Sequence, residues 1–208
     1  AIIARKYGFL AIQIHAAHGY LLSQFMNPLL NNRKDKFSSN SIYIIEKIIK
    51  GIRKHSSDVI LDIRLNLYDD LEDKQKEIQH KSKLIEKIIS LDIDLVSLSQ
   101  GSYNINKFLI YPPIEKGHCF NLAEAKALAI KYKQKYWNIV GNIWDLNLLK
   151  KGIPYNLTFS IGRSLIADPF FILKSLMNKE KDILYCIRCH KCHYYSNGYE
   201  HLSPLSKI

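Results

Sequence analysis

Short apolar runs rich in β-branched residues alternate with longer amphipathic stretches along most of the chain. The apolar runs predict buried strands at residues 10–14, 59–65, 95–99, 137–141 and 157–162. Apolar residues that recur every three or four positions predict helices at residues 42–53, 72–90, 122–132, 146–151 and 169–177. This alternation is typical of βα units, in which parallel strands form one sheet and helices make the crossovers.

The number of predicted strands is too small for a closed barrel. A parallel barrel has eight strands and takes about 250 residues, whereas this chain has 208 residues and five predicted strands. Residues 1–8 have the pattern of the last turn of a helix closed by Gly8, and the first residue is Ala1. Since a protein rarely starts inside a helix, we expect further residues upstream.

Three side chains that can exchange protons follow the first predicted strand. These are His15, His18 and Tyr20, with Gly19 between the last two. The carboxyl ends of strands are where parallel barrels place their chemistry. An imidazole can hydrogen-bond a carbonyl oxygen near neutral pH, and a phenol can act as a general acid.

Two longer runs carry a resemblance to a known family. Residues 15–25, with Asn27-Pro28-Leu29 and residues 32–35, resemble the old yellow enzyme family of FMN-dependent NAD(P)H oxidoreductases. Residues 161–169 are similar to the second signature of that family. The resemblance matches the segments to the fourth to eighth strands of a (β/α)8 TIM barrel. It implies an incomplete barrel over residues 1–180, followed by a Cys-rich segment, 181–208.

The resemblance also implies roles for the first run. His15 and His18 would hold the carbonyl oxygen of an electrophilic alkene or other carbonyl substrate, and Tyr20 would protonate its α-carbon. Donors aimed at that oxygen would stabilise the charge that develops as hydride arrives. The alternative interpretation is that both histidines are hydrogen-bonded residues at the barrel end with no catalytic role.

Arginine and glycine residues near other strand ends are candidates for binding the cofactor. Burying Arg64 without an anionic or electron-rich partner is costly, and the matching arginine of the family lies against the flavin ring. The alternative partner is Asp62, in a structural ion pair. The loops after strands seven and eight often bind phosphate in such barrels. We assign that role to the last two predicted strand ends, at Gly141, Asn142, Gly162 and Arg163.

Ser99 and Gly101 resemble the serine–glycine pair that follows the sixth strand in the family. We assign these two residues no role beyond a tight turn near the site.

The C-terminal segment contains candidate metal ligands. Cys186, Cys189 and Cys192 have spacings that suit an iron–sulfur cluster or zinc. Relatives with a cluster have a fourth cysteine about a dozen residues later, but residues 201–205 contain none. His190 or His193 could complete a zinc site. The alternative is a relic of a cluster motif or a set of reduced cytosolic thiols.

The net charge of +11 permits two interpretations. Clustered Lys and Arg would indicate nucleic-acid binding, but the lysines are spread over predicted helices, which favours solvated faces. We expect no nucleic-acid partner, no membrane span and a cytoplasmic location. We expect a homo-oligomer or a complementing N-terminal half as the macromolecular partner.

Departures from the family leave other functions open. The usual Tyr-Gly-Gly-Ser is replaced by residues 37–40, Phe-Ser-Ser-Asn, and the acidic-Asn-Arg triplet that normally follows is missing. Our first hypothesis is an FMN-dependent ene-reductase segment that needs the missing strands. The alternatives are a non-catalytic remnant or half-barrel, and a basic metal- or nucleic-acid-binding module.

Overall fold

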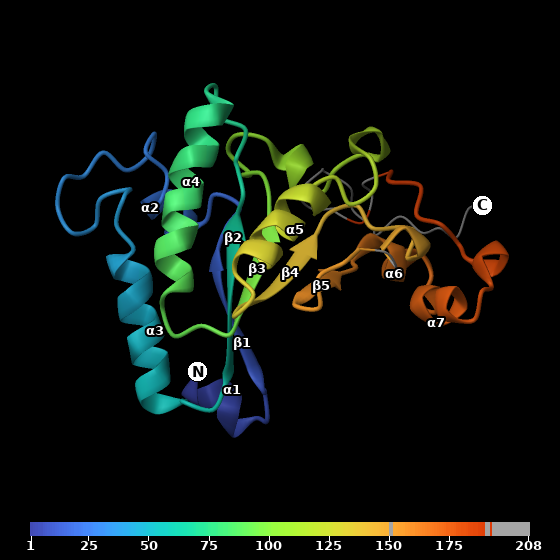
Figure 1. Ribbon diagram of the computed structural model, residues 1–208, viewed down its shortest axis with the longest axis horizontal. Coiled ribbons are helices and arrows are strands. Elements are labelled where there is room, and N and C mark those ends of the chain that lie inside the picture. Colours follow the sequence, from blue (N-terminus) through green and yellow to red (C-terminus); the bar gives the residue numbers. More distant parts are fainter. Residues whose placement is uncertain (150–151, 190–191, 193–208) are drawn as a thin grey trace.

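Five parallel strands form the centre of the molecule. The structure is a computed structural model, which describes residues 1–149, 152–189 and 192. The strands lie side by side in chain order (Figure 1) as β1 (Ala11–Ala16), β2 (Ile60–Asn66), β3 (Leu95–Ser99), β4 (Tyr136–Val140) and β5 (Leu157–Ser160). The predicted α/β fold with an incomplete (β/α)8 barrel is thus confirmed.

Long helices cover one face of this sheet. They are α3 (Tyr43–His55), α4 (Lys74–Ile89) and α5 (Leu122–Lys131). Isoleucine and leucine side chains on the inner sides of α3 and α4, such as Ile45 and Ile88, are buried in the same apolar core as the strands. Figure 1 shows α3 and α4 side by side along the sheet. Burial of this apolar surface is the main force that holds the layers together.

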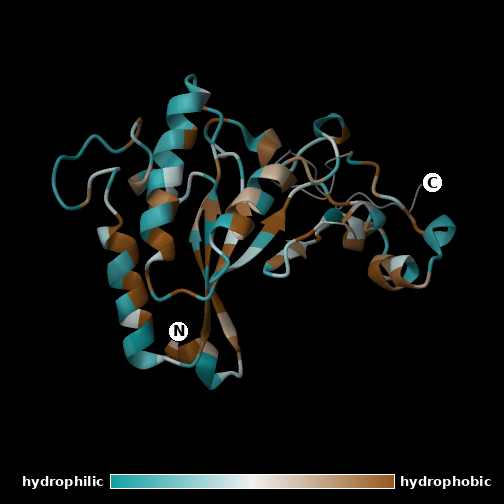
Figure 2. Cartoon of the chain, in the orientation of Figure 1, coloured by the Kyte–Doolittle hydropathy of each residue, from teal (hydrophilic) through white to brown (hydrophobic). Residues whose placement is uncertain are grey.

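The two faces of the sheet differ in polarity because side chains alternate along each strand. On β4, Trp137 and Ile139 are fully buried on the helix side, whereas Asn138 between them points to the opposite face. Figure 2 shows the hydrophobic bands on the strands and the hydrophilic outer sides of α3 and α4.

The opposite face carries a polar chain where barrels usually place bulky apolar side chains. Hydrogen bonds run across all five strands through Gln13, Asp62, Ser97, Asn138 and Ser160.

The segments at the two ends of the sheet are short. The predicted helical turn at the start is confirmed as α1 (Ile2–Lys6), followed by Gly8 at φ +83°. At the other end of β1, the short helix α2 (Leu21–Phe25) follows the strand (Figure 1). Short 3₁₀ turns, η1 (Lys107–Leu109) and η2 (Ile114–Lys116), shape the long loop after β3.

The last third of the chain departs from the predicted helices. The expected helix 146–151 contains a 3₁₀ turn, η3 (Asn147–Leu149), and residues 150–151 lie outside the described residues. The expected helix 169–177 begins later, as α7 (Phe171–Leu176), and a further 3₁₀ turn follows, η4 (Glu180–Asp182).

The sequence pattern also missed α6 (Arg163–Ala167). The reason for the late start of α7 lies in Asp168, predicted as the N-cap. It accepts hydrogen bonds from the backbone N–H groups of Phe170 and Leu184 and from Lys174 Nζ.

In the described part of the chain, no helix is both long enough and apolar enough to cross a membrane.

Candidate active site

The two signature runs meet at the same edge of the sheet. Tyr20 follows the carboxyl end of β1, and Arg163 follows the carboxyl end of β5. Because all neighbouring strands pair in parallel, these ends point the same way. This edge therefore gathers both sets of predicted residues.

His15, His18 and Tyr20 form one cluster of rings. The centroid of the His15 ring lies 5.1 Å from that of His18 and 5.2 Å from that of Tyr20. A sharp turn brings them together, with His18 at φ +62° and Gly19 at φ +81°. A Cβ on Gly19 would lie 2.3 Å from Ser102 Oγ, so only glycine fits this turn.

Ser99 links His18 to Arg64. Its Oγ lies 2.7 Å from His18 Nε2 and accepts a hydrogen bond from Arg64 Nη2 at 3.2 Å. A serine hydroxyl has one donor and two acceptor lone pairs, so it can pair with either tautomer of His18 while it accepts from Arg64. Sequence reasoning gave Ser99 no such role, since a serine in a tight turn carries no signal of its tertiary partners.

Burial keeps both imidazoles neutral at physiological pH. It is the main cause that lowers the pKa of His18 to about 3, and the charge of Arg64 and the nearby His15 lower it further. Burial also lowers the pKa of His15, with Arg64 as the second cause. Neutral imidazoles can donate to a carbonyl oxygen without bringing a full charge into the site.

Arg64 does not form the ion pair that the sequence left open. In the described residues Arg64 and Asp62 make no salt bridge, and Asp62 Oδ2 accepts instead from Gln13 Nε2 at 2.5 Å and Ser97 Oγ at 2.8 Å. Arg64 Nε is buried and has no hydrogen-bond partner. An unpartnered buried donor is costly, so this nitrogen fits an electron-rich ligand at the site.

Tyr103 is a second phenol beside Tyr20 that the sequence did not single out. The two rings meet edge to face with centroids 5.8 Å apart. Burial is the first cause that raises the pKa of Tyr103, and the neighbouring Tyr20 is the second. Both rings remain partly exposed, so they can exchange protons with solvent.

A small cavity gathers the four residues predicted to bind phosphate. It has a volume of about 150 Å³, and its lining includes Gly141, Asn142, Gly162, Arg163 and Arg188. Arg163 Nη2 donates to Asn142 Oδ1 at 3.2 Å, and Arg163 Nη1 is buried without a hydrogen-bond partner. A buried guanidinium with an unused donor fits the anionic tail of a phosphorylated cofactor.

The two glycines of this cavity differ in what surrounds them. A Cβ on Gly141 would lie 2.6 Å from Asn121 Oδ1, so its neighbours exclude a side chain. A Cβ on Gly162 would meet nothing within 4 Å, and the backbone there is open to a ligand. Asn142, at φ +55°, is held by hydrogen bonds from its Nδ2 to the carbonyls of Pro113 and Gly117.

The C-terminal segment contains the three candidate metal-binding cysteines. Cys186, Cys189 and Cys192 are free thiols, and the part of the chain that the structure describes holds no group of three His, Cys, Asp or Glu side chains suited to a metal. His190, His193 and residues 201–205 lie outside the described residues. The metal or cluster at these cysteines stays a prediction from their spacing, and no step below uses it.

A larger cavity, of about 810 Å³, is lined by segments that follow β1 and β2 and by none of the ring cluster. It lies between α4 and the segment after α2, and its lining includes Asn27, Leu29, Glu72 and His80. None of the predicted site residues lines it, so we place the chemistry at the strand ends.

Comparison with known proteins points to one family. The model of the NADH:flavin oxidoreductase / NADH oxidase family matches residues 1–182. An NADPH dehydrogenase of Clostridium acetobutylicum is 29% identical over 189 residues, which cover 86% of this chain and 52% of the relative. An NADH oxidase of Thermoanaerobacter brockii is 28% identical over 203 residues, or 91% of this chain and 30% of the relative. The chain thus spans about half the length of the first relative and less of the second.

Solved structures show the same architecture. A 2-naphthoyl-CoA reductase in complex with 2-naphthoyl-CoA superposes with a TM-score of 0.75 at 25% identity, covering 92% of this chain and 30% of the other. The 6-hydroxypseudooxynicotine amine oxidase of Pseudomonas geniculata has a TM-score of 0.73 at 17% identity, covering 95% and 30%, and this second match bears on the fold alone.

Proposed function

Since the chain belongs to the NADH:flavin oxidoreductase / NADH oxidase family, we propose that, as part of a complete barrel, it reduces alkenes conjugated to a carbonyl with bound FMN and NAD(P)H. One observation carries the proposal. The ring cluster after β1 and the cavity after β4 and β5 lie at the same edge of one parallel sheet. That edge offers a cavity for an anionic tail and a separate cluster of proton-handling groups.

The described residues fit FMN at two points. The unpartnered Nη1 of Arg163 and the open backbone at Gly162 suit the phosphate, and the unpartnered Nε of Arg64 suits the electron-rich ring. Bound FMN would supply hydride taken from NAD(P)H. A guanidinium beside the ring would favour the negative charge of the reduced cofactor.

The protein's own residues then handle the acceptor. His15 and His18 would donate hydrogen bonds to the carbonyl oxygen, where negative charge develops as hydride reaches the β-carbon. The Ser99 hydroxyl is hydrogen-bonded to His18 Nε2, so Nδ1 is the nitrogen that would face the substrate oxygen. Tyr20 would transfer its phenolic proton to the α-carbon and recover one from solvent, directly or through Tyr103. The product gains one hydride and one proton, which saturates the double bond.

The two half-reactions test this proposal separately. We expect the protein with its barrel complete to bind FMN, to be reduced by NADH or NADPH, and to be reoxidised by an enone such as cyclohexenone, each followed by flavin absorbance in a stopped-flow instrument. Reduction by the nucleotide without reoxidation by any conjugated carbonyl would contradict the ene-reductase assignment. Failure to bind FMN would contradict the whole proposal.

A further inference from the structure

A second arginine lines the phosphate cavity, and it comes from the cysteine segment. Arg188 lies between Cys186 and Cys189 in the sequence, and its side chain reaches the cavity that Arg163 also lines. We propose that Arg188 is a second residue that binds the phosphate of the cofactor, an inference that rests on the proposed function. The phosphate residues predicted from sequence did not include it.

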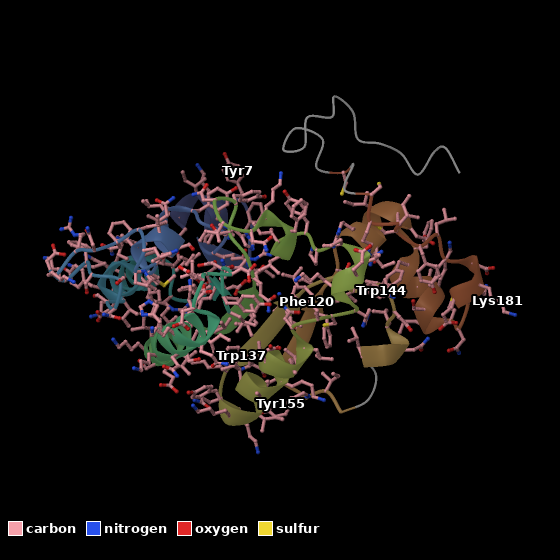
Figure 3. All side chains as sticks on the ribbon, turned by 90° about the horizontal axis from the view of Figure 1, so that it is seen from above. Tyr7, Phe120, Trp137, Trp144, Tyr155 and Lys181 are labelled. Carbon is pink, nitrogen blue, oxygen red and sulfur yellow. The ribbon has the colours of Figure 1, made fainter. Side chains whose placement is uncertain are left out.

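Three contacts hold the Arg188 guanidinium in place. Its Nε donates to Asn142 Oδ1 at 3.0 Å, its Nη1 donates to the Cys186 carbonyl at 2.5 Å, and its central carbon lies 4.9 Å from the centroid of the Trp144 ring. Figure 3 shows Trp144 beside the C-terminal part of the chain, whereas Trp137 lies among the strands. The side chain is only 6% exposed. A flexible arginine fixed by contacts from several segments is already ordered before a ligand arrives.

The two guanidinium groups share one neutral acceptor. Both Arg163 and Arg188 donate to Asn142 Oδ1, and neither forms an ion pair with a carboxylate in the part of the chain that the structure describes. Two neighbouring positive charges repel each other, and buried charges without a counter-charge are costly. A phosphate monoester, which carries nearly two negative charges at neutral pH, would balance both of them.

A purely structural arginine would be expected to look different. Such a residue usually pairs with a carboxylate or uses its donors on carbonyls away from any cavity. Here the buried Nη1 of Arg163 is unused, and the open backbone of Gly162 lines the same cavity as Arg188. The arrangement is that of a preformed anion site with two cationic residues.

The test compares FMN with riboflavin, which lacks the phosphate. Dissociation constants would be measured from flavin fluorescence for the wild-type protein, Arg188→Gln and Arg188→Lys. Lys54→Gln is the control, because it removes one positive charge from an exposed position on α3. We expect Arg188→Gln to weaken FMN binding by about tenfold or more, to leave riboflavin binding unchanged, and to weaken competition by inorganic phosphate.

Several outcomes would decide the matter. If Arg188→Gln binds FMN as tightly as Lys54→Gln does, while Arg163→Gln loses FMN, the role of Arg188 is overturned and the proposed function stands. If the wild-type protein binds FMN no better than riboflavin, the proposed function itself fails. If Arg188→Gln does not fold, Arg188→Lys decides, since it keeps the charge but not the two-pronged geometry. A selective loss of FMN affinity in Arg188→Lys supports the proposal, and equal losses for both flavins overturn it.

Discussion

The two clusters at the edge of the sheet differ in how far the protein satisfies its own polar groups. After β1 to β3, the serine hydroxyl at position 99 connects His18 with Arg64, and the phenol of Tyr20 has a phenol neighbour. After β4 and β5, two guanidinium groups converge on one amide oxygen. The first cluster is ready for a neutral oxygen, whereas the second retains positive charge that an anion would balance. Under the proposed function, the acceptor would bind at the first cluster and the cofactor's phosphate at the second.

Replacing Tyr20 by Phe should have the largest effect, and only on the first cluster. Losing a general acid typically slows a reaction by about a hundredfold or more, so reoxidation by an enone should fall by that factor. Flavin reduction by NAD(P)H and FMN affinity should be unchanged, because the phenol lies after β1 and the phosphate cavity lies after β4 and β5. Stopped-flow absorbance measures both half-reactions, and unchanged reoxidation would remove Tyr20 from the mechanism.

Substitutions of the two cavity glycines should affect different properties, stability in one case and FMN affinity in the other. We expect Gly141→Ala to lower the free energy of unfolding by about 1–3 kcal/mol, because its new Cβ would collide with the Asn121 side chain. Gly162→Ala should leave stability nearly unchanged, since a Cβ there meets open space, yet weaken FMN binding where the backbone approaches the phosphate. Urea denaturation measures the stability of the two variants, and flavin titration measures their FMN affinity. Equal losses of stability in both variants would contradict the predicted difference between the two glycines.

Acid should destabilise the folded protein through the first cluster. The pKa of His18 is about 3 in the folded state and about 6.5 in an unfolded chain. The contribution of this neutral imidazole is therefore complete above pH 6.5 and is lost as the pH falls from 6.5 toward 3. His18→Gln should flatten the decline in unfolding free energy, whereas the exposed control His55→Gln on α3 should not. If the unfolding free energy of His18→Gln depends on pH as in the wild-type protein, the lowered pKa of His18 is contradicted.

The smallest effect is expected at Ser99. Removing the hydroxyl in Ser99→Ala frees His18 Nε2 from its 2.7 Å partner, so the ring loses the contact that orients it. We expect reoxidation to slow by about three- to tenfold, consistent with one neutral hydrogen bond, with no change in flavin reduction. Single-turnover rates with an enone measure this, and a loss as large as that of Tyr20→Phe would point to a direct catalytic role instead.

Much of this arrangement was predictable, and the missing parts share a physical cause. His15, His18 and Arg163 lie in long runs with distinctive residues, and the strand pattern placed both runs at one edge. Ser99 and Arg188 were missed because their partners lie 81 and 46 residues away in the chain. Local spacing carries no information about such contacts. The start of the helix after Asp168 was predicted wrongly for the same reason, because the hydrogen-bond partners of Asp168 include the distant Leu184 N–H.

The central claim is that the cavity after β4 and β5 holds the phosphate of a flavin whose chemistry is completed after β1. The most direct measurement is the ratio of FMN to riboflavin affinity in the wild-type protein, Arg163→Gln and Tyr20→Phe. We predict a ratio of about a hundred or more in the wild-type protein and in Tyr20→Phe, and a fall by about tenfold or more in Arg163→Gln. A wild-type ratio near one, or a high ratio that survives in Arg163→Gln, would contradict the claim.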